Sequence, residues 1–223
     1  MPQHEITLRS PQGRLILIPP NAADDELHAK LRSHPITHKA MPYGPKRISI
    51  EEARGIREKR AAQGVLSFFV HKLNPDGSSA FVGACGLHSI DEEHASAHVG
   101  IVISPDYHRG GIATEALYML LRFGFEDRKF HRIVFETAAD NDRMKGWLEK
   151  VVGAEQESKM RECWKTSEGY VDVVGYALLD WEWSGRIKAQ LESRLHIEGE
   201  KASESRADDD IQGLDAQVSS VAL

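Results

Sequence analysis

The chain has 223 residues, 41% of them hydrophobic, and a formal net charge of −6. A chain of this length can bury one substantial core, and no apolar run approaches the roughly 20 residues that a membrane-spanning helix needs. The N-terminal segment lacks an apolar secretory core, so we expect a cytoplasmic protein with no membrane partner. Residues 191–223 hold eight acidic and three basic residues. The remainder is nearly neutral, which argues against nucleic-acid binding.

Cysteine and histidine usage gives no metal or disulfide pattern. Cys85 and Cys163 are far apart in sequence, so we expect two reduced packing residues. The eleven histidines are scattered and lack the spacing of metal ligands. We therefore predict that the protein holds no metal.

The first ninety residues alternate between strand and helix patterns. Two prolines end the first strand, Asn21 or Asp24 opens the first helix, and Ser49 caps the second. Closely spaced prolines after residue 34 predict an irregular segment, and an Asn-Pro-Asp-Gly sequence at 74–77 predicts a hairpin turn. The predicted elements are a strand at 14–18, a helix at 23–32, an irregular segment at 34–45, a helix at 49–63, and strands at 65–72 and 80–90.

The central stretch, 97–125, is the most informative part of the chain. Val99–Ile103 is a β-branched run that predicts a buried strand, ended by a Ser-Pro-Asp turn. Apolar residues then recur with helical spacing from Ala113, so Arg109–Thr114 open a helix. The first-turn amides of a helix suit an anion, and Gly110 with Gly111 lets a phosphate approach the backbone.

The last third of the chain predicts one more strand, one helix and a final hairpin. We expect a strand at 132–137, a helix capped by Asn141 and ended by Gly153, and strands at 155–165 and 170–183. Residues 184–223 are predicted to form a C-terminal helix and an acidic, disordered tail. That tail could instead serve as an interaction segment or cover an active site.

The stretch 97–125 resembles motif A of the GNAT superfamily of N-acetyltransferases, and further segments extend the resemblance to its RimJ/RimL-type branch. The resemblance covers residues 10–183, the expected catalytic domain. It implies an α+β fold, with a central mixed, mostly antiparallel sheet of about seven strands and helices on both faces. The segments that carry it are Gly83–Ile90, Pro105–Tyr107, Ile112–Ala116, His131–Ile133, Asn141, Leu148–Lys150 and Asp172–Leu178.

The resemblance implies a binding site for acetyl-CoA as a co-substrate. Asn141 has two interpretations, a helix cap and a contact to the cofactor, and both can hold at once. The loop departs from the family pattern at His108 and Gly110, and Arg109 can compensate for the second departure. The residues implied in cofactor binding are Ile101, Val102, Ile103, Arg109, Gly110, Gly111, Ile112, Ala113, Thr114 and Asn141.

Direct attack of an amine on a thioester requires a base, and two candidates stand in the central strands. His98 occupies a position that often carries glutamate in this branch, and imidazole suits proton abstraction near neutral pH. Its alternative role is that of a partly buried strand residue. Glu136 is either a solvent-facing edge residue or a base in the cleft, and the first interpretation is favoured. His88 and Asp91 could also reach an incoming amine.

The expected general acid is missing, since Met144 and Leu148 stand where the family has serine or tyrosine. Solvent or the product ammonium could supply that proton. The sequence therefore predicts an N-acetyltransferase acting on a protein N-terminus or a small amine. A non-catalytic, regulatory module that binds acyl-CoA is the alternative. We expect a monomer, or a dimer through the last strands. The acceptor site should be bounded by Pro35–Pro45, the turn near Asp91 and the last hairpin. Trp164, Trp181 and Trp183 either pack or form an aromatic wall.

Overall fold

A computed structural model describes residues 4–197. One eight-stranded sheet runs in the order β1-β2-β3-β4-β5-β6-β8-β7. Neighbouring strands are antiparallel except β5 and β6, which are parallel, so the predicted mixed, mostly antiparallel sheet is confirmed. The strands are β1 (Leu8–Arg9), β2 (Leu15–Ile18), β3 (Leu66–Leu73), β4 (Ser79–Asp91), β5 (Ser96–Ile103), β6 (Arg132–Ala138), β7 (Glu155–Thr166) and β8 (Gly169–Leu179).

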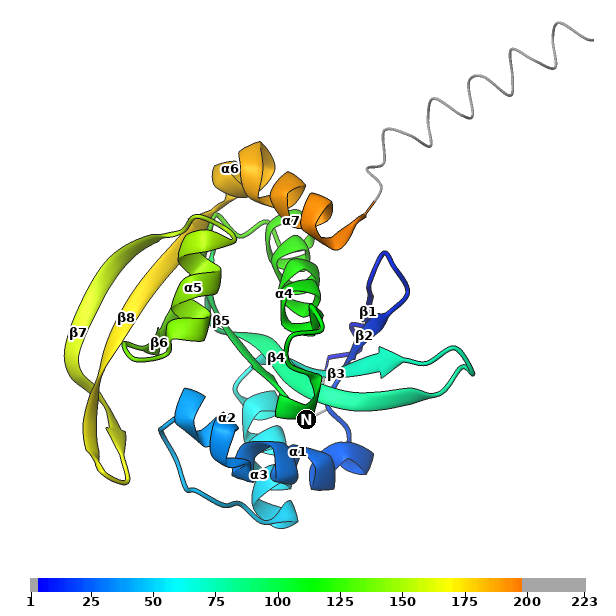
Figure 1. Cartoon of the computed structure of the whole chain (residues 1–223), viewed down its shortest axis with the longest axis vertical. Helices are drawn as coiled ribbons and strands as arrows, with labels where there is room; N and C mark the ends of the chain where they lie inside the picture. The colour runs from blue at the N-terminus through cyan, green and yellow to red at the C-terminus, as the bar shows by residue number, and fades with distance from the viewer. Residues whose placement is uncertain (1–3, 198–223) are drawn as a thin grey trace, which may run out of the picture.

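Helices cover both faces of the sheet, as predicted (Figure 1). Helices α1 to α3 lie on one face, and α4, α5 and α7 lie on the other. The helices are η1 (Ala22–Asp24), α1 (Asp25–Ser33), α2 (Pro35–Ala40), α3 (Ile50–Ala62), η2 (Pro105–Tyr107), α4 (Ile112–Arg122), η3 (Phe123–Asp127), α5 (Asp142–Lys150), α6 (Asp180–Glu182), η4 (Trp183–Ile187) and α7 (Lys188–Leu195).

Helix α2 corrects the expectation of an irregular segment at 34–45. Pro35 stands in the first turn of α2, where a missing N–H costs nothing. The Nδ1 atom of His34 caps the same turn by accepting a hydrogen bond from the Ile36 amide at 3.1 Å. The proline spacing therefore starts a short helix here, and only the stretch after Ala40 lacks regular structure until Ile50.

The predicted final strand is too long at its C-terminal end. Strand β8 ends at Leu179, and residues 180–195 are helical. The Glu182 carboxylate accepts a hydrogen bond from the Leu179 amide at 3.1 Å, and the Asp180 carboxylate accepts one from the Trp181 amide at 2.7 Å. Acidic side chains thus satisfy backbone N–H groups at the start of this helical segment and favour it over the strand.

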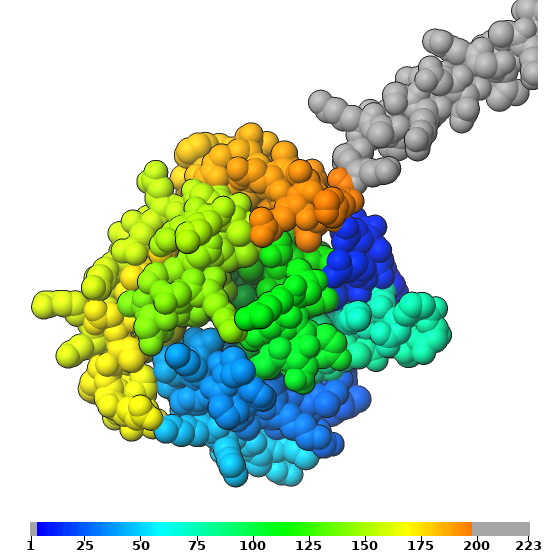
Figure 2. All heavy atoms as spheres, viewed as in Figure 1, coloured from blue at the N-terminus to red at the C-terminus, as the bar shows by residue number. Residues whose placement is uncertain are grey.

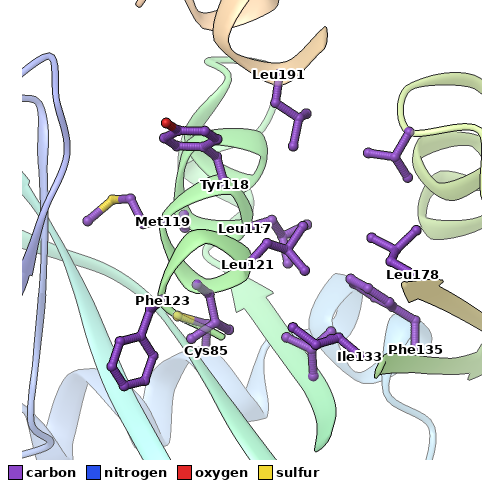
Figure 3. Close-up of a cluster of buried hydrophobic side chains, with 14 of the residues drawn as sticks. Cys85, Leu117, Tyr118, Met119, Leu121, Phe123, Ile133, Phe135, Leu178 and Leu191 are labelled. Atoms are coloured by element: carbon purple, nitrogen blue, oxygen red, sulfur yellow. The ribbon is translucent and has the colours of Figure 1, made fainter. Parts of the chain in front are cut away.

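The helical C-terminal segment belongs to the same core as α4. Leu191 and Leu195 of α7 are buried in that core, and the Tyr118 hydroxyl donates a hydrogen bond to Glu192 at 2.8 Å. Trp183 stacks on Phe125 with ring centroids 5.6 Å apart. Figure 3 shows Leu191 above Tyr118 on α4, with Cys85 of the sheet below the helix. The expected acidic tail falls mostly on residues 198–223, which lie outside the described residues.

The parallel strands β5 and β6 separate in their second halves. Their pairing runs from Ser96 with Arg132 to Val99 with Phe135. Beyond those pairs, β5 continues to Ile103 and β6 to Ala138. In the described chain, Gly100–Ile103 therefore has no strand partner on its β6 side, although β4 still pairs with its other side. This separation opens the sheet beside the start of α4.

Candidate functional site

The loop before α4 presents a helix start that no side chain caps. Gly111 is the N-cap residue, and its backbone is left-handed with φ of +77°. A side chain at this position would be strained by the torsion, although no atom lies within 4 Å of the place of a Cβ. Because glycine offers no capping oxygen, the first-turn amides and the positive end of the helix dipole are available to an anion.

Two arginines and a histidine hold this loop in place. The His108 Nε2 group donates to the Ile103 carbonyl at 3.0 Å, which leaves Nδ1 to accept from Arg143 of α5 at 3.0 Å. Arg14 donates to the Gly110 carbonyl at 3.0 Å and pairs with Glu115, which is completely buried. His108 thus links the loop to both β5 and α5. Sequence reasoning missed Arg14 and Arg143, because neither is near the motif in sequence.

A cleft of about 1220 Å³ runs from this loop, past the separated ends of β5 and β6, to helices α1 and α2. Figure 2 shows the surface hollowed where α4, α5 and α2 meet. Nine of the ten residues predicted to bind the cofactor line this cleft. They are Ile101, Val102, Ile103, Arg109, Gly111, Ile112, Ala113, Thr114 and Asn141.

Gly110 and Asn141 contribute through their own hydrogen bonds. Gly110 is the tenth predicted residue; it is not part of the cleft wall, and its carbonyl accepts the bond from Arg14. The Asn141 Oδ1 atom accepts from the Met144 amide at 3.4 Å, and Nδ2 donates to Thr137 at 2.8 Å. The predicted role of Asn141 as a helix cap is therefore confirmed, and its contact with the cofactor stays a prediction.

The structure separates the two predicted bases. Glu136 is exposed to solvent, as the favoured interpretation expects, and it also lines the cleft. Its strand β6 lies between β5 and β8, but the pairing with β5 ends at Phe135, one residue before Glu136. His98 does not line the cleft. It faces His88 across the β4–β5 pairing, with ring centroids 5.6 Å apart, and His88 is the residue that reaches the cleft.

His88 is held in its neutral form. Burial lowers its pKa to about 4, and the neighbouring His98 and Arg60 add to that effect. A neutral imidazole at pH 7 can donate and accept hydrogen bonds, but a base this weak takes up a proton poorly. Asp91 is exposed and accepts hydrogen bonds from His94 instead of lining the cleft.

Aromatic side chains close the cleft at its end away from the loop. Trp164 of β7 packs edge-on against Tyr43, with ring centroids 4.9 Å apart, and both line the cleft. Trp183 is buried against Phe125, and Trp181 is exposed outside the cleft. Of the three tryptophans considered for an aromatic wall, Trp164 is thus the one in position to form it.

Helix α5 places no general acid at the two positions where the family resemblance leads us to expect one. Leu148 is completely buried, and Met144 lines the cleft with a thioether that has no proton to give. Residues 4–197 contain no group of three or more His, Cys, Asp or Glu arranged to hold a metal ion. Both cysteines are free. No helix in the described range is long and apolar enough to cross a membrane.

The fold and cleft define an α+β protein in which a helix start and two separated parallel strands form one binding site. A family model described as an acetyltransferase (GNAT) domain matches residues 14–152. This chain therefore belongs to the GNAT acetyltransferase family.

Relatives of known sequence or structure agree with that membership. YdaF of Bacillus subtilis (strain 168), named as a proposed ribosomal N-acetyltransferase, is 30% identical over 110 residues, which cover 49% of this chain and 58% of YdaF. A proposed acetyltransferase from T. thermophilus has a TM-score of 0.72 at 25% identity, covering 87% of this chain and all of that one. Mycobacterium smegmatis RimJ, solved in complex with CoA-disulfide, shares the fold with a TM-score of 0.69 at 24% identity, over 85% of this chain and 95% of RimJ.

Proposed function

We propose that this protein transfers an acetyl group from acetyl-CoA to a primary amine by direct attack. The observation that carries the proposal is the continuity of one cleft from the uncapped start of α4 to the gap between β5 and β6. Such a cleft suits a long coenzyme with phosphates at one end and a reactive group at the other. The N-acetyltransferase name of YdaF and the CoA-disulfide bound to RimJ support the same activity.

The residues at the loop end of the cleft fit a nucleotide coenzyme. The first-turn amides of α4 have no side-chain cap, and Arg109 and Arg143 line the cleft beside them. The backbone of Gly100–Ile103 offers hydrogen-bonding groups to an extended chain along β5. Bound there, acetyl-CoA supplies an acyl group on a thioester that a neutral amine can attack.

The side chains that line the cleft are the ones available for proton transfer. As the C–N bond forms and the C–S bond breaks, the amine nitrogen gives up one proton, and the departing thiolate takes one from solvent. We assign the first proton to Glu136, because its carboxylate lines the cleft beside the gap between the strands. His98 is the alternative base, acting from behind His88.

The proposal also covers the cellular compartment and the oligomeric state of the protein. Two free cysteines are compatible with a reducing, cytoplasmic compartment. Strand β7 is an edge of the sheet and supports either a monomer or a dimer through the last strands. Light scattering on the full chain separates these two states.

A thiol-release assay with mass spectrometry of the acceptor tests the proposed function. We expect the full chain with acetyl-CoA to release free thiol and add one acetyl group to an amine-bearing acceptor from a panel of peptides, amino acids and polyamines. Binding of CoA with no release across the panel would favour the non-catalytic module. No binding of CoA would contradict the proposal as a whole.

A further inference from the structure

The end of the cleft beneath α1 and α2 contains buried polar atoms that have no partner. The Nδ1 atom of His28, the Nε atom of Arg32 and the hydroxyl of Thr37 are fully buried and make no hydrogen bond. The side chains that carry two of them are nearly inaccessible, since His28 is 5% exposed and Thr37 4%. All three residues line the cleft. Because an unpaired buried polar atom is costly, this cluster is a candidate for binding a polar group.

Two arginines line the cleft on the same side as these atoms. Arg32 of α1 and Arg60 of α3 both line the cleft, and neither forms an ion pair within residues 4–197. Arg57, one turn before Arg60, shows the contrast, because it donates two hydrogen bonds of 2.9 Å to the buried Asp25. The protein thus neutralises one arginine of α3 internally and leaves the next one facing the cleft.

Burial and the positive charge of the arginines lower the pKa of the histidines in this region. Burial, together with the charges of Arg32 and Arg60, lowers the pKa of His28 to about 4, and the Asp25 carboxylate opposes this shift. Arg60 also acts on the pKa values of His88 and Arg32. The two guanidinium groups and the two imidazoles all line the same cleft, and we call them the cationic pocket (His28, Arg32, Arg60 and His88).

The acidic residues of the cleft come from a different part of the chain. The three cleft-lining acids are Glu136 of β6, Asp140 of the turn that follows β6, and Asp142 at the start of α5. None of the cleft-lining residues that α1, α2 and α3 contribute in the described chain is acidic. An acceptor lying in the cleft therefore meets carboxylates from one part of the chain and two guanidinium groups from another.

We propose that the acceptor is an amine that also carries a carboxylate, with the carboxylate held by the cationic pocket and the amine directed towards Glu136. The inference rests on the proposed acetyl transfer and names the chemistry of its acceptor. Arginine is the side chain best suited to hold a carboxylate through paired hydrogen bonds. A polyamine would bring more positive charge to the same pocket. The carboxylate comes either from a free amino acid or from an acidic side chain near a peptide N-terminus.

Matched acceptors test this inference. Thiol release is measured with the full chain and acetyl-CoA for a free amino acid, a short peptide with acidic residues after its N-terminus, the same peptide with those residues as amides, and spermidine. We expect an acidic acceptor to have the highest kcat/KM, roughly ten- to hundredfold above the amide peptide. The better of the amino acid and the peptide identifies the source of the carboxylate.

Variants of the pocket supply a second readout. Arg32→Gln and Arg60→Gln should raise KM for the acidic acceptor roughly tenfold and leave the amide peptide nearly unchanged. Lys59→Gln is the matched control, because Lys59 is an exposed cation of the same helix outside the cleft. Unchanged melting temperature and CoA affinity show that each variant is folded.

A binding measurement tests the inference even when no turnover is detected. The N-acetylated acidic peptide, titrated calorimetrically in the presence of CoA, should bind roughly tenfold or more tightly than its amide form, and Arg60→Gln should remove that difference. Equal binding of the two forms, or a preference for spermidine, would overturn the inference and leave acetyl transfer standing. Failure to bind CoA would instead remove the proposed function, and this inference with it.

Discussion

The two ends of the cleft are built to recognise their ligands by different means. At the loop end, backbone amides at the start of α4 are set by the left-handed torsion of Gly111. At the other end, side chains from α1 and α3, Arg32 and Arg60 among them, converge beneath the sheet. A backbone site is sensitive to torsions and tolerates different side chains, whereas a side-chain site depends on a few individual groups. Substitutions should therefore act on one end at a time.

The residue between the two ends should have the largest effect. Glu136→Gln keeps the shape of the side chain but removes the proton acceptor, so we expect kcat to fall by roughly 10²- to 10⁴-fold. The affinity for CoA should stay unchanged, because Glu136 belongs to neither end. Steady-state kinetics and calorimetry measure these two quantities separately.

Two further variants complete that test. Glu93→Gln alters an exposed glutamate in the turn between β4 and β5, outside the cleft, and should keep full activity. His98→Ala tests the alternative base. A large fall in kcat for His98→Ala, with Glu136→Gln active, would reverse our assignment.

The loop end is most sensitive at Gly111. Gly111→Val forces a β-branched residue into a backbone with φ of +77°, so the turn must change and the α4 amides must move. We expect the affinity for CoA to fall about 100-fold, as measured by calorimetry. Gly146→Ala is the control, since Gly146 lies within α5 with open space around it. An unchanged affinity in Gly111→Val would show that the loop does not bind the coenzyme.

The acceptor end should make the protein sensitive to acid. The pKa of His28 is about 4 in the folded protein, against roughly 6.5 when unfolded. The unfolded chain therefore binds more protons between these values, and stability is lost as the pH falls from about 6.5 to about 4. His28→Asn should remove up to about 3 kcal/mol of this loss.

Urea unfolding at pH 7.5 and at pH 5 measures that difference. The wild type should lose more stability than His28→Asn between the two pH values. Parallel losses in the two proteins would show that His28 is not held neutral in the fold.

Weakening the contacts that hold the loop before α4 should have the smallest effect on the affinity for CoA. Arg143→Ala removes the hydrogen bond to the Nδ1 atom of His108 and one positive charge beside the start of α4. We expect the affinity for CoA to fall by roughly three- to tenfold, with KM for the acceptor unchanged. A change confined to the acceptor KM would mean that Arg143 serves the other end.

The difference between local and long-range features explains which parts of the fold and of the site the sequence could predict. The strand, the glycine pair and the amphipathic helix at 97–125 are local patterns, and the structure has each of them. The pairing of His98 with His88 depends on the register of β4 against β5, and Arg32 and Arg60 meet only because α1 packs on α3. Such long-range contacts leave no periodic trace in the sequence. Helix α2 is not predicted for a local reason. The sequence shows several closely spaced prolines, and nothing in their spacing indicates which of them starts a helix.

Hydrogen exchange on the full chain tests the two-ended cleft most directly. Peptides that cover 100–103 and 109–114 should become protected when acetyl-CoA is added, while those that cover Arg32 and Arg60 stay unchanged. The N-acetylated acidic peptide, added with CoA, should then protect the second set. Protection by acetyl-CoA at α1 and α3 alone, with none at 109–114, would contradict the account.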